Sequence, residues 1–285
     1  MRFRTSAMGV VMALLISLLG FPQSSFAAER ANRLISLFEA GKAAIGMYIG
    51  ARAPNMARVV GASGLDCIIV DMEHDVYDYP EVHQYMMDVQ DAPRFGLGKP
   101  GTPLPSILVK LAHRGTWDPR HDIAHSFKMG PVVGVFVPFV ESRADLEKAI
   151  SAARNPEMLQ LEGISGEERR ARLDVWPLHP KGELLVVAMI ESEAGIKNAR
   201  EIMETPGLGV FHIAHAPEPD MEKMLQMCLE RGVVCGREET DPSKVKHWID
   251  AGYKLIDLGW DYRMYQRELS ESLTTIHSSL EKDGK

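Results

Sequence analysis

The chain has 285 residues, of which 45% are hydrophobic and 25% are charged, and its formal net charge is −7. This composition is typical of a folded globular protein and excludes a mainly disordered chain. The negative charge argues against nucleic acids and anionic lipid surfaces as partners, because both attract basic proteins.

The N-terminal segment has the pattern of a secretory signal. Arg2 and Arg4 precede the apolar run AMGVVMALLISLLGF, and small residues with the spacing of a signal-peptidase site follow it. We therefore expect residues 1–28 to be removed and residues 29–285 to be exported to the periplasm, with no stable membrane anchor after cleavage. The alternative is an uncleaved anchor, although the run is shorter than the ~20 residues that span a bilayer.

Three cysteines, Cys67, Cys228 and Cys235, are too few for a disulfide-stapled scaffold. We expect all three to be buried thiols that pack as small hydrophobic side chains. A Cys228–Cys235 bridge is the alternative.

Eight apolar runs alternate with stretches of helical periodicity. We expect strands at residues 44–50, 67–73, 105–111, 133–140, 184–191, 210–215, 233–236 and 254–261. The runs are continuous, as in parallel strands that are covered on both faces.

Helices are expected between the runs, among them residues 142–154, with Ser142 as N-cap, and residues 192–204. Long connections are expected at residues 92–104 and 155–183, and the stretch after residue 261 has helical periodicity.

The strict alternation of strands and helices predicts a single (β/α)₈ TIM barrel domain with a C-terminal helix, an α/β fold. The competing fold is an open doubly wound sheet with a dinucleotide site. That fold needs a glycine-rich turn after the first strand, and IGARAPN has no such spacing.

Polar residues gather where the predicted strands end, and in a barrel these ends converge on the site. They are Glu73, His74, Lys110, Arg114, Glu191, His215 and Glu218. Carboxylates can hold a hard divalent cation, an imidazole can transfer protons, and a cation can hold an acidic substrate. The alternatives are a salt bridge for Glu191 and a structural role for His74.

Five segments are similar to the HpcH/HpaI aldolase/citrate lyase family over about residues 34–268: LFEAGKAAIGMYIG, SGLDCIIVDMEH, GVFVPFVESRADLEKAI, MIESEAGIKNAREIMETPGLGVF and AGYKLIDLGWD. The resemblance implies a (β/α)₈ barrel, usually hexameric, that makes or cleaves carbon–carbon bonds next to a pyruvate unit. It also implies a divalent ion, Mg, Mn or Co, that stabilises the enolate.

The resemblance assigns roles to particular residues. It implies proton transfer by His74, a metal carboxylate at Glu191, and binding of the substrate by Lys110, which stands where the family has arginine, or by Arg114. We expect Asp71 and Glu73 to support these groups from behind.

The turn after the sixth run departs from the family pattern. The family's second metal carboxylate falls on Pro217, which cannot be a side-chain ligand. We expect Glu218 to take its place, with His215 or Asp220 as alternatives.

Two functions follow from these patterns. The first is a metal-dependent lyase that acts on a 2-oxo acid, such as a 4-hydroxy-2-oxo acid, by retro-aldol cleavage or aldol addition. The alternative is a non-catalytic periplasmic protein that binds a small acid on an eroded aldolase scaffold.

Overall fold

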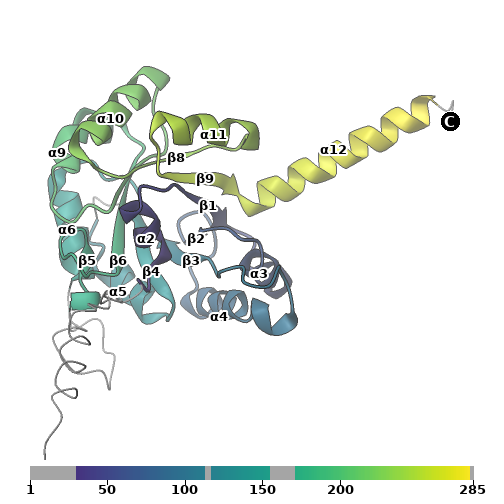
Figure 1. Ribbon diagram of the computed structural model, residues 1–285, viewed down its shortest axis with the longest axis horizontal. Coiled ribbons are helices and arrows are strands. Elements are labelled where there is room, and N and C mark those ends of the chain that lie inside the picture. Colours follow the sequence, from purple (N-terminus) through teal and green to yellow (C-terminus); the bar gives the residue numbers. More distant parts are fainter. Residues whose placement is uncertain (1–29, 113–116, 155–170, 283–285) are drawn as a thin grey trace, which may run out of the picture. The chain divides into compact units, whose positions relative to one another are not determined.

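Eight parallel strands close into a barrel in the computed structural model, which describes residues 30–112, 117–154 and 171–282 (Figure 1). The strands are β1 (Ala44–Ile49), β2 (Cys67–Asp71), β3 (Ser106–Lys110), β4 (Val132–Val137), β6 (Leu184–Ile190), β7 (Val210–Ile213), β8 (Cys235–Glu238) and β9 (Leu255–Trp260). They pair in chain order, β9 pairs with β1, and the β4–β6 ladder completes the ring. The predicted TIM barrel is confirmed, and the expected strands agree with the observed ones to within three residues at each end.

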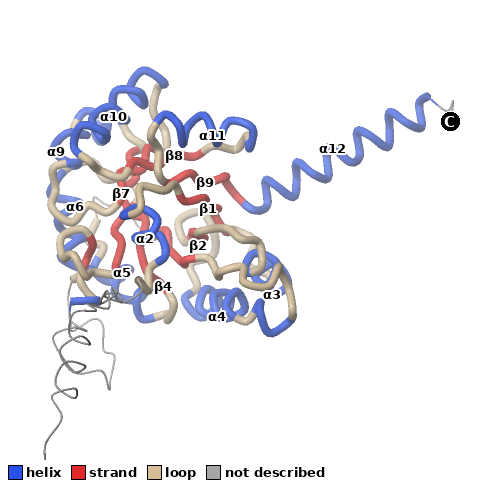
Figure 2. The backbone as a smooth tube through the Cα atoms, in the orientation of Figure 1, coloured by secondary structure: helices blue, strands red, loops and turns tan. Residues whose placement is uncertain are grey.

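Helices cover the outside of the barrel, as the tube in Figure 2 shows. They are α3 (Pro54–Gly61), α4 (Tyr79–Gln90), α5 (Arg120–Lys128), α6 (Arg143–Ala153), α10 (Glu218–Arg231) and α11 (Pro242–Ala251), whereas α2 (Arg33–Glu39) packs its buried side chains into the barrel interior. The expected cap is present, since the Ser142 side chain accepts a hydrogen bond from Asp145 N at the start of α6.

Two details differ from the sequence expectations. The two-residue strand β5 (Val175–Trp176) lies in the expected connection 155–183 and pairs with the first residues of β6. The expected helix 192–204 is two short helices, α8 (Glu193–Lys197) and α9 (Ala199–Met203). Asn198 separates them, and its side-chain amide donates to the Glu141 carbonyl at 2.8 Å. The connection 92–104 begins with the 3₁₀ helix η1 (Ala92–Phe95).

Alternate residues of each strand face opposite sides of the sheet, because side-chain direction has a period of two. Ile68, Val70 and Ile256 belong to the core between the strands and the helices. Ile69 and Leu255 belong to the core inside the barrel, to which α2 also contributes. Toward the C-terminal strand ends the buried residues include polar ones, among them Asp71, Lys110 and Asp257.

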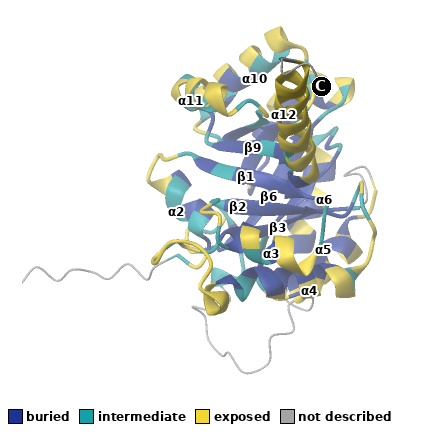
Figure 3. Ribbon diagram, turned by 90° about the vertical axis from the view of Figure 1, so that its right-hand side faces the viewer, coloured by how far each residue is buried: buried dark blue, intermediate teal, exposed yellow. Residues whose placement is uncertain are grey.

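The last helix, α12 (Asp261–Lys282), leaves the barrel after β9 and runs outward (Figure 1). Its side chains are largely exposed beyond the first turns, whereas the strands are buried (Figure 3). Within the described ranges, no helix has both the length and the apolarity to cross a membrane.

The cysteines are in the state that we expected. Cys67, Cys228 and Cys235 are free and buried, and the alternative Cys228–Cys235 bridge is absent. Burial raises the pKa of the Cys235 thiol well above its usual value, which keeps the thiol protonated.

Candidate active site

A cavity of about 390 Å³ opens at the C-terminal end of the barrel, where sites of this fold lie. The residues that line it come from the eight strands of the barrel, at or just after their C-terminal ends, and from the start of α12: Tyr48, His74, Lys110, Phe139, Met189, Glu191, His212, Ala214, His215, Glu238, Trp260, Tyr262 and Arg263. Aromatic rings therefore form part of the wall, and titratable groups face one another across the space.

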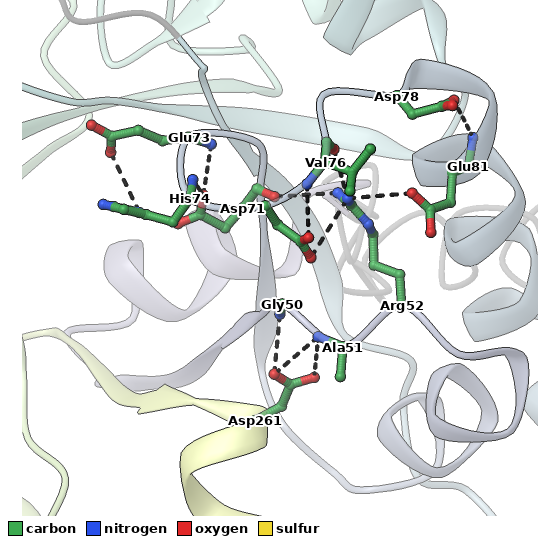
Figure 4. Close-up of polar contacts among 11 residues, drawn as sticks. Gly50, Ala51, Arg52, Asp71, Glu73, His74, Val76, Asp78, Glu81 and Asp261 are labelled. Carbon is green, nitrogen blue, oxygen red and sulfur yellow. Dashed lines mark hydrogen bonds and ion pairs between the residues drawn. The ribbon is translucent and has the colours of Figure 1, made fainter.

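Asp71, the last residue of β2, organises one side of the cavity (Figure 4). Its fully buried carboxylate accepts hydrogen bonds through Oδ1 from Glu73 N at 2.7 Å and from His74 N at 2.8 Å. Its Oδ2 lies 3.2 Å from His74 Nδ1. Because Nδ1 faces the carboxylate, Nε2 is the ring nitrogen that remains for a substrate.

Lys110, the last residue of β3, is buried beside this group. Its Nζ lies 2.7 Å from Glu73 Oε2, 3.6 Å from Asp71 Oδ2 and 3.4 Å from His74 Nδ1. A buried lysine is stable only with such partners, so Lys110, Glu73, Asp71 and His74 form one unit. We call these four residues the β2–β3 group.

Glu191 follows β6 and is held from the neighbouring strand. Its Oε1 accepts a hydrogen bond from Phe139 N at 2.9 Å. Phe139 has φ +51°, in the left-handed region that a phenylalanine rarely adopts. This strained conformation directs a backbone N–H toward the carboxylate and fixes Glu191 in the cavity wall.

A second polar group comes from β7, β8 and β9. His212 is buried, and its Nε2 lies 2.8 Å from Oδ2 of the fully buried Asp257. Asp257 also accepts a hydrogen bond from Gly259 N at 3.2 Å. Glu238 ends β8 beside them. We call His212, Glu238 and Asp257 the β7–β9 group.

Burial raises the pKa of two acidic groups that line the cavity, Glu238 and Tyr48. Burial, and then the charge of Asp257, raise the pKa of Glu238, while His212, His215 and Arg263 lower it. Burial, followed by Asp257 and Glu191, raises the pKa of Tyr48 well above its usual value. Tyr48 is therefore a neutral phenol that can donate a hydrogen bond.

The structure brings most of the predicted residues together. His74, Lys110, Glu191 and the alternative residue His215 line the cavity. Asp71 and Glu73 contact His74 and Lys110 from behind, as expected.

Two predicted residues are not part of this arrangement. Glu218 is the exposed first residue of α10 and does not line the cavity, and Asp220 lines a separate depression with α8 and α9. Arg114 and the predicted signal peptide lie outside the described residues.

Sequence reasoning missed part of the wall, namely Tyr48, Phe139, His212, Glu238, Trp260 and Arg263, and it missed Asp257, which contacts His212 from behind. A signal was present for the β7–β9 group. His212 and Asp257 each interrupt an apolar run at a position whose period-two neighbours face the barrel interior.

The side chains do not form the two-carboxylate metal site that the resemblance implies. Glu191 Oε1 already accepts the Phe139 N–H, and the expected partner Glu218 is outside the cavity. Across the part of the chain that the structure describes, no group of three or more His, Cys, Asp or Glu side chains has an arrangement that could hold a metal ion.

The closed parallel barrel thus carries, at its C-terminal mouth, a histidine held by a carboxylate and a buried lysine, a set of groups that is chemically able to transfer protons. The chain belongs to the HpcH/HpaI aldolase/citrate lyase family, whose model matches residues 44–218.

Individual relatives are distant but cover most of the chain. A 2-dehydro-3,6-dideoxy-6-sulfogluconate aldolase from Pseudomonas putida is 21% identical and covers 82% of this chain and 92% of its own length. A 5-keto-4-deoxy-D-glucarate aldolase from Salmonella newport is also 21% identical, and the match covers 86% of this chain and 96% of that aldolase. A solved family member from Burkholderia cenocepacia has a TM-score of 0.68 at 19% identity and covers 86% and 99%. The chain is accordingly an enzyme of the lyase class.

Proposed function

We propose that this lyase cleaves, or in reverse forms, the carbon–carbon bond of a 2-oxo acid such as a 4-hydroxy-2-oxo acid. The observation that carries the proposal is His74, which Asp71 orients beside the buried Lys110 at the mouth of the barrel. The aldolase names of the relatives support the same reaction type.

Different residues of the cavity bind the acidic substrate and transfer its proton. Lys110 and Arg263 line the cavity and supply positive charge for the substrate carboxylate and for the enolate that cleavage produces. Arg263 has no ion-pair partner within the described ranges, whereas the charge of Lys110 is shared with Glu73 and Asp71. His74 Nε2 takes the proton from the hydroxyl group as the bond breaks.

The divalent ion is the part of the prediction that the donor set does not support. Family members are generally metal-dependent, but here only Glu191 of the expected carboxylate pair lines the cavity. We therefore assign no step to an ion. Metal analysis of the purified protein beside Glu191→Ala and Glu218→Ala decides the question: loss of a bound ion from both variants would show that Glu218 reaches the site.

The non-catalytic binding protein, the alternative from the sequence, has no support from the comparisons, because the relatives are aldolases. A direct assay separates the two functions. Purified protein is incubated with a panel of 4-hydroxy-2-oxo acids, and released pyruvate is measured with a coupled dehydrogenase. We expect turnover that falls by a factor of about 10²–10⁴ in His74→Ala.

The matched control for this assay is His247→Ala on the outer helix α11, which we expect to retain turnover because His247 is exposed and distant from the cavity lining. Binding of the acids without turnover by the wild-type protein would favour the binding protein and refute the lyase proposal.

We also propose that the chain forms a homo-oligomer, a hexamer by the family resemblance. The supporting observation is a row of exposed apolar side chains on α12 at helical spacing: Tyr265, Leu269, Leu273, Ile276 and Leu280 are 44–69% exposed. Light scattering of the wild type and of Leu273→Glu tests this, and a monomeric wild type would refute it.

Export to the periplasm remains a proposal that rests on the pattern of residues 1–28. N-terminal sequencing of the protein from a periplasmic fraction tests it. We expect the mature chain to begin at Ala28 or Glu29, and an intact N-terminus in the cytoplasmic fraction would refute export.

A further inference from the structure

The two polar groups of the cavity lie on opposite walls of the barrel. In the closed ring, three strands separate β2 from β7 in either direction, and three separate β3 from β8. His74 and Lys110 therefore face His212 and Glu238 across the cavity that all four residues line. The proposed function uses the first wall and leaves the second without a role.

The second wall holds a buried polar atom that the fold does not satisfy. His212 Nδ1 is buried and has no hydrogen-bond partner in the described part of the chain, and the same is true of the hydroxyl of Tyr48 on β1, between the two walls. An unsatisfied buried polar group destabilises the fold, and such groups in a cavity are the ones that a ligand can satisfy.

The neighbouring backbone leaves space for the imidazole. A Cβ atom on Gly236 would lie 2.8 Å from His212 Cδ2 and 3.3 Å from the Leu255 carbonyl oxygen. Asp257 then holds the ring, because its carboxylate accepts a hydrogen bond from Nε2 at 2.8 Å. This arrangement, in which a carboxylate orients an imidazole, is also found for His74 and Asp71 on the first wall.

Glu238 is the member of the β7–β9 group that stands at the strand end. Its carboxyl group lines the cavity and has no hydrogen bond or ion pair to another described residue. The charged and titratable groups that act on it are Asp257 and Arg263, together with His212 and His215. A carboxyl group that is partly buried and free of protein partners is available to a substrate.

We propose that Glu238 is a second catalytic residue that exchanges a proton with C3 of the 2-oxo acid, and that His212 and Asp257 are its positioning residues. This inference rests on the proposed function. When the C3–C4 bond breaks, its electron pair forms the enolate of the 2-oxo acid, and C4 becomes the aldehyde carbon. His74 takes the hydroxyl proton, and Glu238 delivers a proton to C3, so that no oxidant or reductant is needed.

Pyruvate alone tests this step, because Glu238 would remove a C3 proton from it in the reverse direction. The experiment measures by NMR the exchange of pyruvate methyl protons with D₂O for wild type, Glu238→Gln and the control Glu222→Gln, an exposed carboxylate on α10. We expect exchange by wild type and control, and a rate lower by a factor of at least about 100 in Glu238→Gln. Pyruvate affinity, measured by calorimetry, should change less than threefold.

The positioning role has its own readout. Asp257→Asn removes the charge that helps to raise the pKa of Glu238, so the rise of the exchange rate with pH should move to lower pH. A variant that had only lost stability would keep the wild-type pH profile, and such a profile would overturn the role of Asp257.

The outcomes separate this inference from the proposed function. Exchange without cleavage of any 4-hydroxy-2-oxo acid would contradict the proposed function and leave Glu238 as the proton-transfer residue. Exchange that survives in folded Glu238→Gln, or no exchange by the wild type, would overturn the inference.

Discussion

Lys110→Met is the substitution that tests most directly how the β2–β3 group is held together. Lys110 is 3% exposed, and its removal leaves the buried carboxylate of Asp71 and the partly buried carboxylate of Glu73 without their cation. Breaking a buried ion pair on one side costs about 3–5 kcal/mol. Asp71 still accepts two backbone hydrogen bonds, so most of the destabilisation comes from the unpaired charge of Glu73. We therefore expect the free energy of unfolding to fall by the lower end of this range, about 3 kcal/mol.

For a barrel of this size, a loss of 3 kcal/mol corresponds to a fall in Tm of about 6–12 °C. Thermal unfolding followed by circular dichroism measures it, with Lys42→Met, an exposed lysine, as the control. The double variant Lys110→Met/Glu73→Gln should recover most of the stability but none of the pyruvate-forming activity, because the uncompensated charge is gone while the cation is still missing. A single variant within 2 °C of wild type, or a double variant no more stable than the single one, would refute this reasoning.

Three further substitutions give distinct outcomes. Gly236→Ala should lower proton exchange by a factor of about 100, because its Cβ, 2.8 Å from His212 Cδ2, displaces the ring by a sizeable part of 1 Å; unchanged exchange kinetics would contradict this. Asp71→Asn should abolish turnover but keep the fold, because it weakens the contact that orients His74; kinetics beside a melting curve check it. Since the folded-state pKa of Glu238 is raised, wild type loses stability as pH rises from the ordinary glutamate value through the folded one. Glu238→Gln should therefore be the more stable protein at pH 8, with a difference in Tm that disappears toward pH 4.

The barrel was predictable because each strand is a short, continuous apolar run. Such runs are typical of parallel strands that are covered on both faces, here by the barrel interior and by the outer helices. The ends of the runs were less well defined. Glu73 was expected to end a strand over residues 67–73, but the Asp71 side chain accepts hydrogen bonds from the N–H groups of Glu73 and His74, and β2 ends at Asp71. The short strand β5 has too few residues to show a period.

The first wall of the site was predictable from polar residues at or just after strand ends, whereas the second was not. His212 and Asp257 lie inside strands, where one polar residue has little weight beside several apolar ones. Their meaning depends on which side of the strand faces the barrel interior and on a pairing across 45 residues. Glu218 failed to reach the cavity because Pro217 ends the turn and α10 begins at once.

Because β9 pairs with β1, the barrel can close only after the last strand has been synthesised. Asp261 at the start of α12 accepts hydrogen bonds from Gly50 N and Ala51 N, 211 and 210 residues away, and joins the last strand end to the first (Figure 4). During synthesis, the backbone groups on one edge of β1 have no partner strand until β9, which ends at Trp260, has left the ribosome. Contacts at such separations make folding slow and expose the early strands to aggregation. Truncation before β9 would therefore remove Trp260 and Tyr262 from the cavity wall and leave a sheet that cannot close.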